Sequence, residues 1–330
     1  MRRRDFVTLL SGAAVAWPIA AQAQQPERTR RIGLLAPYND DRDTRVQAYL
    51  PAFKQRLHEL GWIEGRNIRF DYRFTGQDAE RIRVGAEELI ALAPDIIVVW
   101  ANPAAAILRR ATQTIPIVFT TVSDPVGGGF VANLAHPGGN ITGFQNFETA
   151  IGGKWLEVLK EIAPKVRRVA FVYSPEISAH VAFMHAAEAA SSSLGMTVTA
   201  AGVRNAADIE SALTAFAKEP NGGLIVAPSP LIATGQDLII ALAVRLHLPA
   251  IYPFRYFCTN GGLVSYGFDP VEQQRGAALY VDRILKGEKP GDLPVQAPTK
   301  YNLVINLKTA KELGLVVSLQ LQQRADEVIE

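Results

Sequence analysis

Residues 120–144 read TTVSDPVGGGFVANLAHPGGNITGF, and the interpretation of the whole chain starts from this stretch. It follows a short apolar run and turns twice, first through Asp124-Pro125 and the glycines 127–129, then through residues 136–140. Asp-Pro, Gly-Gly and Pro-Gly pairs favour turns because they supply backbone angles that other residues avoid. Such a loop directly after a buried strand permits close approach of the backbone to a ligand. An ordinary strand-to-helix loop followed by a crossover is the alternative.

Apolar runs typical of strands alternate with segments at helical spacing along most of the chain. This alternation predicts parallel sheets with helices on both faces, and its length predicts two doubly wound α/β lobes. The expected strands are 31–36, 67–74, 95–100, 117–121, 168–173, 196–203, 223–227, 250–252, 262–266 and 301–306. The expected helices are 44–60, 78–92, 103–112, 154–163, 178–194, 206–217, 236–246 and 271–286.

The N-terminus has the pattern of an export signal. Residues 2–4 are arginines, residues 7–20 are apolar, and residues 21–23 form an Ala-Gln-Ala site, which predicts cleavage before Gln24. The Arg-Arg-x-Phe order resembles a twin-arginine signal, which implies export after folding. A general secretory signal is the alternative. Either route leads to the periplasm.

Charge and cysteine content exclude several classes of protein. Removing residues 1–23 takes three Arg and one Asp from the 34 basic and 32 acidic residues, which leaves 31 of each. A nearly neutral protein lacks the electrostatic footprint of a nucleic-acid partner. Cys258 is the only cysteine, so an internal disulfide, a cysteine-rich metal site and a lipid anchor on an N-terminal cysteine are excluded. We expect a monomer that is free in the periplasm.

Three motifs carry a resemblance to a known family. The pattern DPVGGGFVANLAHPGGNITG, from Asp124 to Gly143, resembles the signature of the ABC-transporter substrate-binding proteins that include the tryptophan-type binding proteins. The likeness extends to GWIEGRNIRFDYRF at 61–74 and LVINLKTAKELGL at 303–315. The family tends to have a proline after the last motif, where this chain has Val317-Ser318, which leaves the path of the tail open.

The resemblance implies a type I periplasmic binding protein fold, in which the chain crosses between the lobes three times. By that likeness the crossings fall near 141–147, 263–268 and 301–306, and the three crossing strands form a hinge. A continuous accessory domain in the last quarter is the alternative. The resulting division assigns 1–23 to the export signal, 24–143 plus 268–301 to the first lobe, and 144–267 plus 302–330 to the second lobe.

Patterns of catalytic residues are scarce. The chain lacks a G-x-S-x-G nucleophile motif and a G-x-x-x-x-G-K-[ST] phosphate loop. His180 and His185 are five residues apart, so they do not share a helix face as two metal ligands would. Asp124 could act as a general base, but no partner for it is visible. We therefore predict no catalytic residue, no metal and no cofactor.

Polar and aromatic residues that suit a ligand follow the predicted strands, where open parallel sheets bind their ligands. Facing aromatic rings could sandwich a flat group, an acid such as Asp124 or Asp269 could pair with an ammonium, and Ser, Asn and helix N-termini could hold a carboxylate. This set suits an amino acid, with a sugar as the main rival. The candidate ligand-binding residues are Tyr38, Asn39, Trp100, Asn102, Ser123, Asp124, Tyr173, Glu176, Ser229, Tyr252, Tyr266 and Asp269.

The sequence therefore predicts a periplasmic solute-binding protein of an ABC importer that performs no covalent chemistry. The resemblance implies an aromatic or other apolar amino acid as ligand and an ABC permease in the inner membrane as partner. Closure of the lobes around the ligand would be the signal that the permease recognises. Two alternatives stay open: an exported α/β enzyme that uses the same cleft, and a periplasmic ligand sensor for a membrane receptor.

Overall fold

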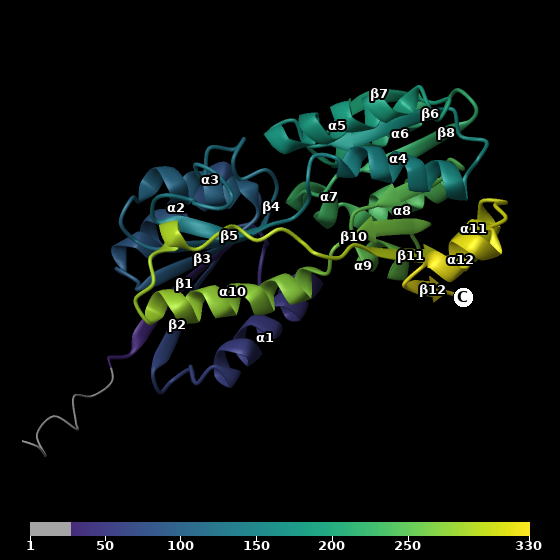
Figure 1. The fold of residues 1–330 in the computed structure, drawn as a ribbon. Coiled ribbons are helices and arrows are strands. Elements are labelled where there is room, and N and C mark those ends of the chain that lie inside the picture. The colour runs from purple at the N-terminus through teal and green to yellow at the C-terminus, as the bar shows by residue number, and fades with distance from the viewer. Residues whose placement is uncertain (1–27) are drawn as a thin grey trace, which may run out of the picture.

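The computed structural model describes residues 28–330, so the predicted export signal, its cleavage site and the start of the following linker lie outside the described residues. Two α/β lobes lie next to each other, and the chain returns to the first lobe late before it ends in the second (Figure 1). Neither lobe is therefore one continuous stretch of sequence. Within residues 28–330, no helix has the length and apolar character that a membrane crossing requires.

The first lobe is a parallel sheet with helices on both faces. Its elements are β1 (Arg30–Ala36), α1 (Thr44–Glu59), β2 (Ile68–Phe74), α2 (Ala79–Ala91), β3 (Ile96–Trp100), α3 (Asn102–Ala111), β4 (Ile117–Val122), β5 (Ile141–Gln145), α10 (Pro270–Leu285) and the 3-10 turn η2 (Pro290–Asp292). The strand order is β2-β1-β3-β4-β5. Helices α1 and α10 cover one face, and α2 and α3 cover the other. The central strand β3 is the fully buried run IIVVW, because only β-branched and other apolar residues suit a strand that is covered on both faces.

The second lobe is larger and contains one antiparallel pair. Its elements are α4 (Ile151–Ile162), β6 (Arg168–Tyr173), α5 (Ser178–Ser191), β7 (Thr197–Gly202), α6 (Ala206–Phe216), β8 (Gly222–Val226), α7 (Pro230–Thr234), α8 (Gln236–Arg245), β9 (Ala250–Tyr252), α9 (Arg255–Thr259), β10 (Val264–Gly267), β11 (Asn302–Asn306), α11 (Leu307–Glu312), α12 (Leu319–Arg324) and β12 (Glu327–Ile329). The strand order is β12-β11-β10-β9-β8-β6-β7, and only β10 and β11 pair antiparallel. The predicted fold class of two mostly parallel α/β lobes is confirmed.

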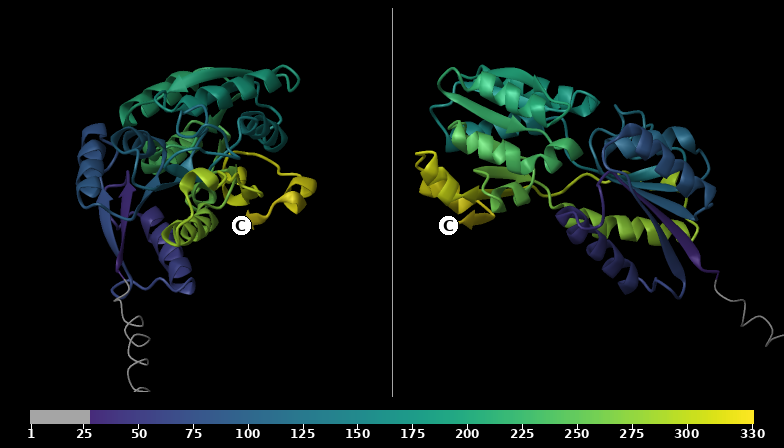
Figure 2. Two further views of the ribbon diagram at one scale, coloured as in Figure 1. Left: turned by 60° about the vertical axis from the view of Figure 1, so that its left-hand side comes forward. Right: turned by 180° about the vertical axis from the view of Figure 1, so that it is seen from behind.

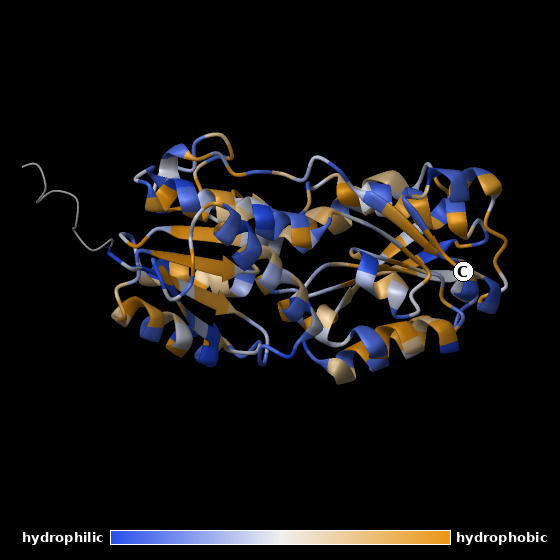
Figure 3. Ribbon diagram, turned by 90° about the horizontal axis from the view of Figure 1, so that it is seen from below, coloured by the Kyte–Doolittle hydropathy of each residue, from blue (hydrophilic) through white to orange (hydrophobic). Residues whose placement is uncertain are grey.

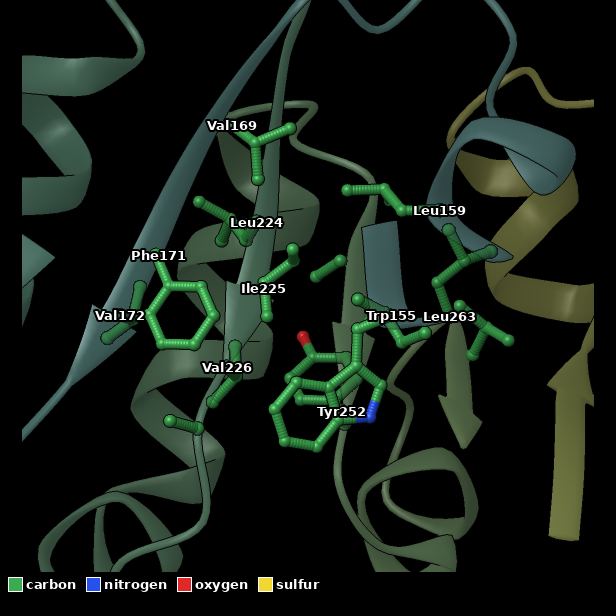
Figure 4. Close-up of a cluster of buried hydrophobic side chains, with 14 of the residues drawn as sticks. Trp155, Leu159, Val169, Phe171, Val172, Leu224, Ile225, Val226, Tyr252 and Leu263 are labelled. Carbon is green, nitrogen blue, oxygen red and sulfur yellow. The ribbon is translucent and has the colours of Figure 1, made fainter. Parts of the chain in front are cut away.

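Apolar side chains from the sheet and from α4 form the core of the second lobe. Trp155 of α4 packs beside Ile225, Tyr252 and Leu263, which come from the second sheet and the residue before β10 (Figure 4). The indole N–H of Trp155 donates to the carbonyl of Tyr266 at 2.8 Å, so this buried donor is paired. Hydropathy colouring shows apolar strands at the centre of both lobes and helices that alternate between apolar and polar residues (Figure 3). Each lobe therefore has a core of its own.

The chain passes between the lobes at residues 146–150, 268–269 and 297–301. The first crossing follows β5, the second follows β10, and the third precedes β11. Each therefore lies directly beside one of the three strands near which the sequence predicts it. The strands themselves stay within one sheet, because β5 pairs with β4 through Gln145, and β10 pairs with β11. Residues 144–145, which the sequence analysis assigns to the second lobe, thus continue the first sheet.

A buried glutamine at the start of α10 holds the second crossing against the first sheet. The Oε1 of Gln273 accepts from the backbone N–H of Thr121 at 2.7 Å, and its Nε2 donates to the carbonyl of Gln145 at 3.0 Å. Thr121 has a φ of 52°, at a place where the register between β4 and β5 shifts. The amide therefore supplies hydrogen bonds to backbone groups that the sheet ladder leaves unpaired.

The glycine-rich stretch 120–144 packs against its own lobe. The N–H of Gly127 donates to the carboxylate of Asp124 at 2.8 Å, and the N–H of Gly138 donates to the carbonyl of Gly291 at 3.3 Å. Gly143 has a φ of 154°, and a Cβ added there would lie 2.1 Å from the carbonyl oxygen of Phe119. These glycines thus permit close approach of one chain segment to another, which matches the alternative of an ordinary loop and crossover.

Replacement of Gly143 by Ala should destabilise the protein by at least about 2 kcal/mol, because the new methyl group overlaps the backbone of β4 and the backbone angle disfavours any side chain. Gly129 is the matched control, since it has a φ of 70° but nothing within 4 Å of an added Cβ. Gly129→Ala should cost only about 1 kcal/mol. Urea unfolding of residues 24–330 measures both, and equal losses would contradict the role of close packing at Gly143.

Candidate functional site

A cavity of about 520 Å³ lies between the lobes, where the carboxyl ends of the strands of both sheets face each other. The right-hand view of Figure 2, seen from behind, shows the two lobes joined by thin connections. On the first lobe, the residues that line the cavity are Pro37, Gln77, Ala79, Ile82, Pro103, Ala106, Ile107 and Arg110. Its second-lobe lining is Ser174, Glu176, Ile177, Arg204, Ser229, Pro230 and Leu231.

Two hydroxyl groups from neighbouring loops form the polar part of the second-lobe wall. The hydroxyl of Ser174, after β6, donates to that of Ser229, after β8, at 2.9 Å. Ser229 is also the N-cap of α7 and accepts from the N–H of Ile232 at 3.2 Å. Both side chains are buried. The two loops are therefore held in one fixed arrangement where they meet the cavity.

His180 also connects these two loops through its imidazole ring. Its Nδ1 accepts from the backbone N–H of Ser174 at 3.2 Å, so the proton must be on Nε2, which lies 3.0 Å from the carbonyl of Pro228. Complete burial lowers the pKa of His180 to about 4, against the opposing effect of these two hydrogen bonds. The imidazole is thus neutral and acts as a structural bridge.

The lobes touch directly at the edges of the cavity. The side-chain Nε2 of Gln77 in the first lobe donates to the hydroxyl of Thr234 at the end of α7, at 2.8 Å. On the second lobe, Arg204 and Glu176 form an exposed ion pair with a nitrogen–oxygen distance of 3.0 Å. An exposed pair of this kind adds little stability, and both of its residues line the cavity.

An arginine surrounded by aromatic rings lies on the other face of the first sheet, at the same edge. The Cζ of Arg45 is 4.7 Å from the centre of the Tyr38 ring. The ring of Trp100 meets Tyr38 edge-on at 6.1 Å and Tyr49 at 5.8 Å. Tyr256 of the second lobe completes this group, since burial raises the pKa of its phenol and the nearby charge of Arg45 opposes that rise. We call these five residues the Arg45 cluster.

Burial controls the charges within the Arg45 cluster. It raises the pKa of Tyr38 to about 12, although Arg45 opposes this shift, and it raises the pKa of Tyr49 well above its ordinary value. Burial also favours the protonated form of Asp43, but the hydrogen bonds and charge of Arg45 outweigh it and lower the Asp43 pKa. Asp43 accepts from Nε of Arg45 at 2.7 Å and also from Nη2. The phenols are therefore neutral and the ion pair is formed.

Four of the predicted ligand-binding residues lie at the cavity or in the Arg45 cluster. Glu176 and Ser229 line the cavity, and Tyr38 and Trp100 belong to the cluster. The residue before Tyr38, Pro37, lines the cavity as well, so the two groups lie on opposite sides of one loop. The structure thus places Glu176 and Ser229 at the cavity and buries Tyr38 and Trp100 in the neighbouring cluster.

The other first-lobe candidates have partners within their own lobe. Asn39 is exposed beside Gly76. The amide of Asn102 bonds both the N–H and the carbonyl of Ser123, at 2.8 Å each. Asp124 has a φ of 44°, and its carboxylate accepts from the turn that follows it. We therefore leave these residues out of the proposed contacts, because Asn102, Ser123 and Asp124 hold loops together and Asn39 is not part of the cavity lining.

The remaining candidates lie in the second lobe or at the hinge. Tyr252 is buried in the core and stacks on Phe257 with ring centres 4.8 Å apart. Tyr266 stacks on Tyr301 at 5.7 Å, and Tyr173 is half-buried against His180. Asp269 caps α10 and lines a separate cavity of about 460 Å³ at the crossings. We leave these residues, too, out of the proposed contacts.

Several residues at this interface were missed by sequence reasoning. Gln77 and Arg110 lie beyond the first residues after a strand, and Arg45 and Tyr256 lie within helices rather than in loops. One signal was available for Arg45. It occupies the face of α1 that otherwise carries Tyr49 and Phe53 at helical spacing, and a charged residue on an apolar face indicates a special partner.

The neutral state of His180 predicts how stability depends on pH. In the unfolded chain the imidazole takes up a proton near pH 6.5, whereas in the folded protein it does so only near pH 4, so stability should fall as the pH drops through this window. The loss from this group should reach about 3 kcal/mol at pH 4. In His180→Gln this part of the loss should disappear.

Urea unfolding at pH 7 and at pH 4 measures the effect as a difference between variants. His136→Gln is the matched control, because its side chain is exposed in a loop. It should lose as much stability on acidification as the natural protein. An equal loss in His180→Gln would contradict the assignment.

Comparisons with known proteins identify a family and a common fold. A model of the family described as ABC transporter substrate binding protein matches residues 42–329. A tyrosine-binding protein from Clostridioides difficile is 25% identical over 264 residues, which cover 80% of this chain and 75% of the relative.

Two solved structures are similar over 91% of this chain and 100% of their own. One is described as an ABC domain in complex with L-Trp from Streptococcus pneumoniae, with a TM-score of 0.84 and 25% identity. The other is a conserved domain protein from Vibrio cholerae, with a TM-score of 0.85 and 29% identity. The similarity therefore extends over both lobes.

Proposed function

Since this chain belongs to the family of ABC transporter substrate-binding proteins, we propose that it captures an aromatic or other apolar amino acid between its lobes and delivers it to an ABC permease. The observation that carries the proposal is the cavity of about 520 Å³ that both lobes line at the carboxyl ends of their strands. Its size is in the range of small-molecule sites, and its position is where open parallel sheets bind ligands. Family and fold are those of solute-binding proteins rather than enzymes.

The chemistry of the interface supports an amino acid with an apolar side chain. Ile82, Ile107 and Ile177 give the cavity an apolar wall from both lobes, and the Arg45 cluster adds aromatic surface. The relatives described as tyrosine-binding and as an L-Trp complex point to the same class of ligand. Ser174 and Ser229 would supply hydrogen bonds to the polar end of such a ligand.

We further propose that the protein works in the periplasm as a monomer. The export signal predicted at residues 1–23 supports this location, and cleavage before Gln24 with no acylated cysteine would leave the protein free of the membrane. Closure about the three crossings would bring the two lobe faces into the register that a permease in the inner membrane recognises.

The first test is a thermal-shift panel of amino acids, sugars and small acids with residues 24–330, preceded by native mass spectrometry to detect a copurified ligand. A ligand at about 100 times its Kd stabilises the folded state by about 2.7 kcal/mol, which should raise the Tm by about 5 °C. An aromatic or apolar amino acid should give the largest shift and be recovered unchanged. A shift confined to sugars, or conversion of the ligand, would contradict the proposal.

Ala106→Phe should abolish this thermal shift, because the side chain of Ala106 lines the cavity and a phenyl ring would fill part of it. Ala91→Phe is the matched control, since Ala91 is exposed at the far end of α2. The control should keep the full shift. Retention of the shift in Ala106→Phe would place the ligand elsewhere.

Gln77→Ala tests the contribution of contacts between the lobes. Loss of its hydrogen bond to Thr234 removes one interaction that only the assembled lobes make, so ligand affinity should fall about two- to tenfold. Gln55→Ala serves as the control, because Gln55 bonds Glu59 on the surface of one helix. Isothermal titration calorimetry measures both, and equal affinities would show that the contact does not contribute to closure.

A further inference from the structure

Two buried hydrogen-bond donors in the Arg45 cluster have no partner. Among residues 28–330, neither Nη1 of Arg45 nor Nε1 of Trp100 has an acceptor in hydrogen-bonding geometry. Trp100 is 1% exposed and Arg45 is 9% exposed, so bulk water does not replace the missing acceptors. Buried donors without partners cost about 1–3 kcal/mol each, and more when charged. Two such donors in one cluster require an acceptor from outside the chain.

The surrounding groups are arranged so that these two donors remain free. Asp43 occupies Nε and Nη2 of Arg45, which leaves Nη1 as the unpaired part of the guanidinium. Tyr38 contacts both side chains: the Cζ of Arg45 is 4.7 Å from the centre of its ring, and the centre of the Trp100 ring is 6.1 Å from it. Both donors therefore belong to side chains that pack on one ring.

The position of the cluster places it within reach of the interlobe space. Trp100 ends β3, and Pro103 at the start of the next helix lines the cavity. Tyr38 directly follows Pro37, another lining residue. Tyr256 reaches Arg45 from the second lobe. The unpaired donors thus lie where the two lobes meet.

On the basis of the function proposed above, we propose that Arg45 and Trp100 bind the carboxylate of the ligand. An indole N–H and a guanidinium can only donate, so the group that they bind must be an acceptor, and the positive charge of Arg45 favours an anion. An amide or alcohol offers fewer acceptor sites and no charge. The ligand is therefore an acid, and the ionised carboxylate is the part that the protein recognises.

This arrangement also couples ligand binding to contact between the lobes. Arg45 is on α1 of the first lobe, and Tyr256 is on α9 of the second. A carboxylate on Nη1 of Arg45 would lie beside the phenol of Tyr256, which burial keeps neutral and able to donate. Binding of the anion would then favour the conformation in which the lobes meet.

The test compares acids with their uncharged analogues by isothermal titration calorimetry. The ligands are L-tryptophan, L-tyrosine and L-phenylalanine, their amides, and the carboxylates indole-3-acetate and phenylacetate, which lack the amine. The natural protein should bind at least one acid about 10- to 100-fold more tightly than the matching amide. The reason is that a hydrogen bond to a charged group contributes more free energy than one to a neutral group, and this difference corresponds to an affinity ratio of that order.

Arg45→Gln should reduce acid binding about 10- to 100-fold and leave amide binding nearly unchanged, so that the preference for the acid disappears. Trp100→Phe should reduce the preference by a smaller factor, because only a neutral donor is lost. Arg110→Gln changes an arginine of the cavity wall and tests that rival position. Arg83→Gln is the matched control, since Arg83 is exposed and pairs with Glu80 and Glu87 of its own helix. It should keep the preference for acids. Circular dichroism and thermal melts identify variants that fail to fold, and the comparison of acid with amide in the natural protein needs no variant.

The outcomes separate this inference from the proposed function. Equal binding of amino acids and their amides would overturn the carboxylate site and leave the amino-acid function standing. Arg45-dependent binding of indole-3-acetate or phenylacetate without binding of any amino acid would support the site and overturn the amino-acid function. Failure to bind any of the carboxylates would overturn both. Loss of acid preference in Arg110→Gln but not in Arg45→Gln would assign the carboxylate to the cavity rim instead.

Discussion

The direction of the strands is the constraint on which the rest of the structure depends. All strands of the first sheet run in parallel, and in the second sheet only β10 and β11 pair antiparallel. Parallel pairing gathers the carboxyl ends at one edge of each sheet, so that the loops that follow them meet there. Three crossings hold these edges opposite each other, and the amide of Gln273 keeps one of the crossings against the first sheet. A cavity lined from both lobes follows from that arrangement.

Most of the helices and strands could be predicted because their signals are local. An apolar run such as IIVVW at 96–100 is typical of a buried strand. The spacing of apolar residues in 271–286 predicts a helix, whichever surface that helix packs against. The short elements α7, α9, α11, α12 and β12 were missed, because segments of three to six residues carry too little periodicity. Their conformation depends on the contacts that they make after the lobes have formed.

The residues of the candidate site also divide into those that the sequence could predict and those that it could not. Glu176 and Ser229 could be found because a position after a strand is a property of chain order. Asp124 and Tyr252 have equally suitable positions, but one bonds its own turn and the other packs into the core. Which way a side chain points after a strand end is decided by tertiary packing, which a single sequence does not reveal. Tyr256 could not be found at all, since it meets the first lobe only in the assembled protein.

The late return of the chain to the first lobe has a consequence for biosynthesis. Helix α10 covers one face of the first sheet and contributes Ala277, Tyr280 and Val281 to that core, yet about 270 residues must be translated before it begins. Until then, the ribosome-bound chain holds a half-covered sheet whose apolar face is open to chaperones or to aggregation. Folding of the N-terminal lobe is therefore completed only when synthesis is nearly finished, whatever the intrinsic speed of its local segments.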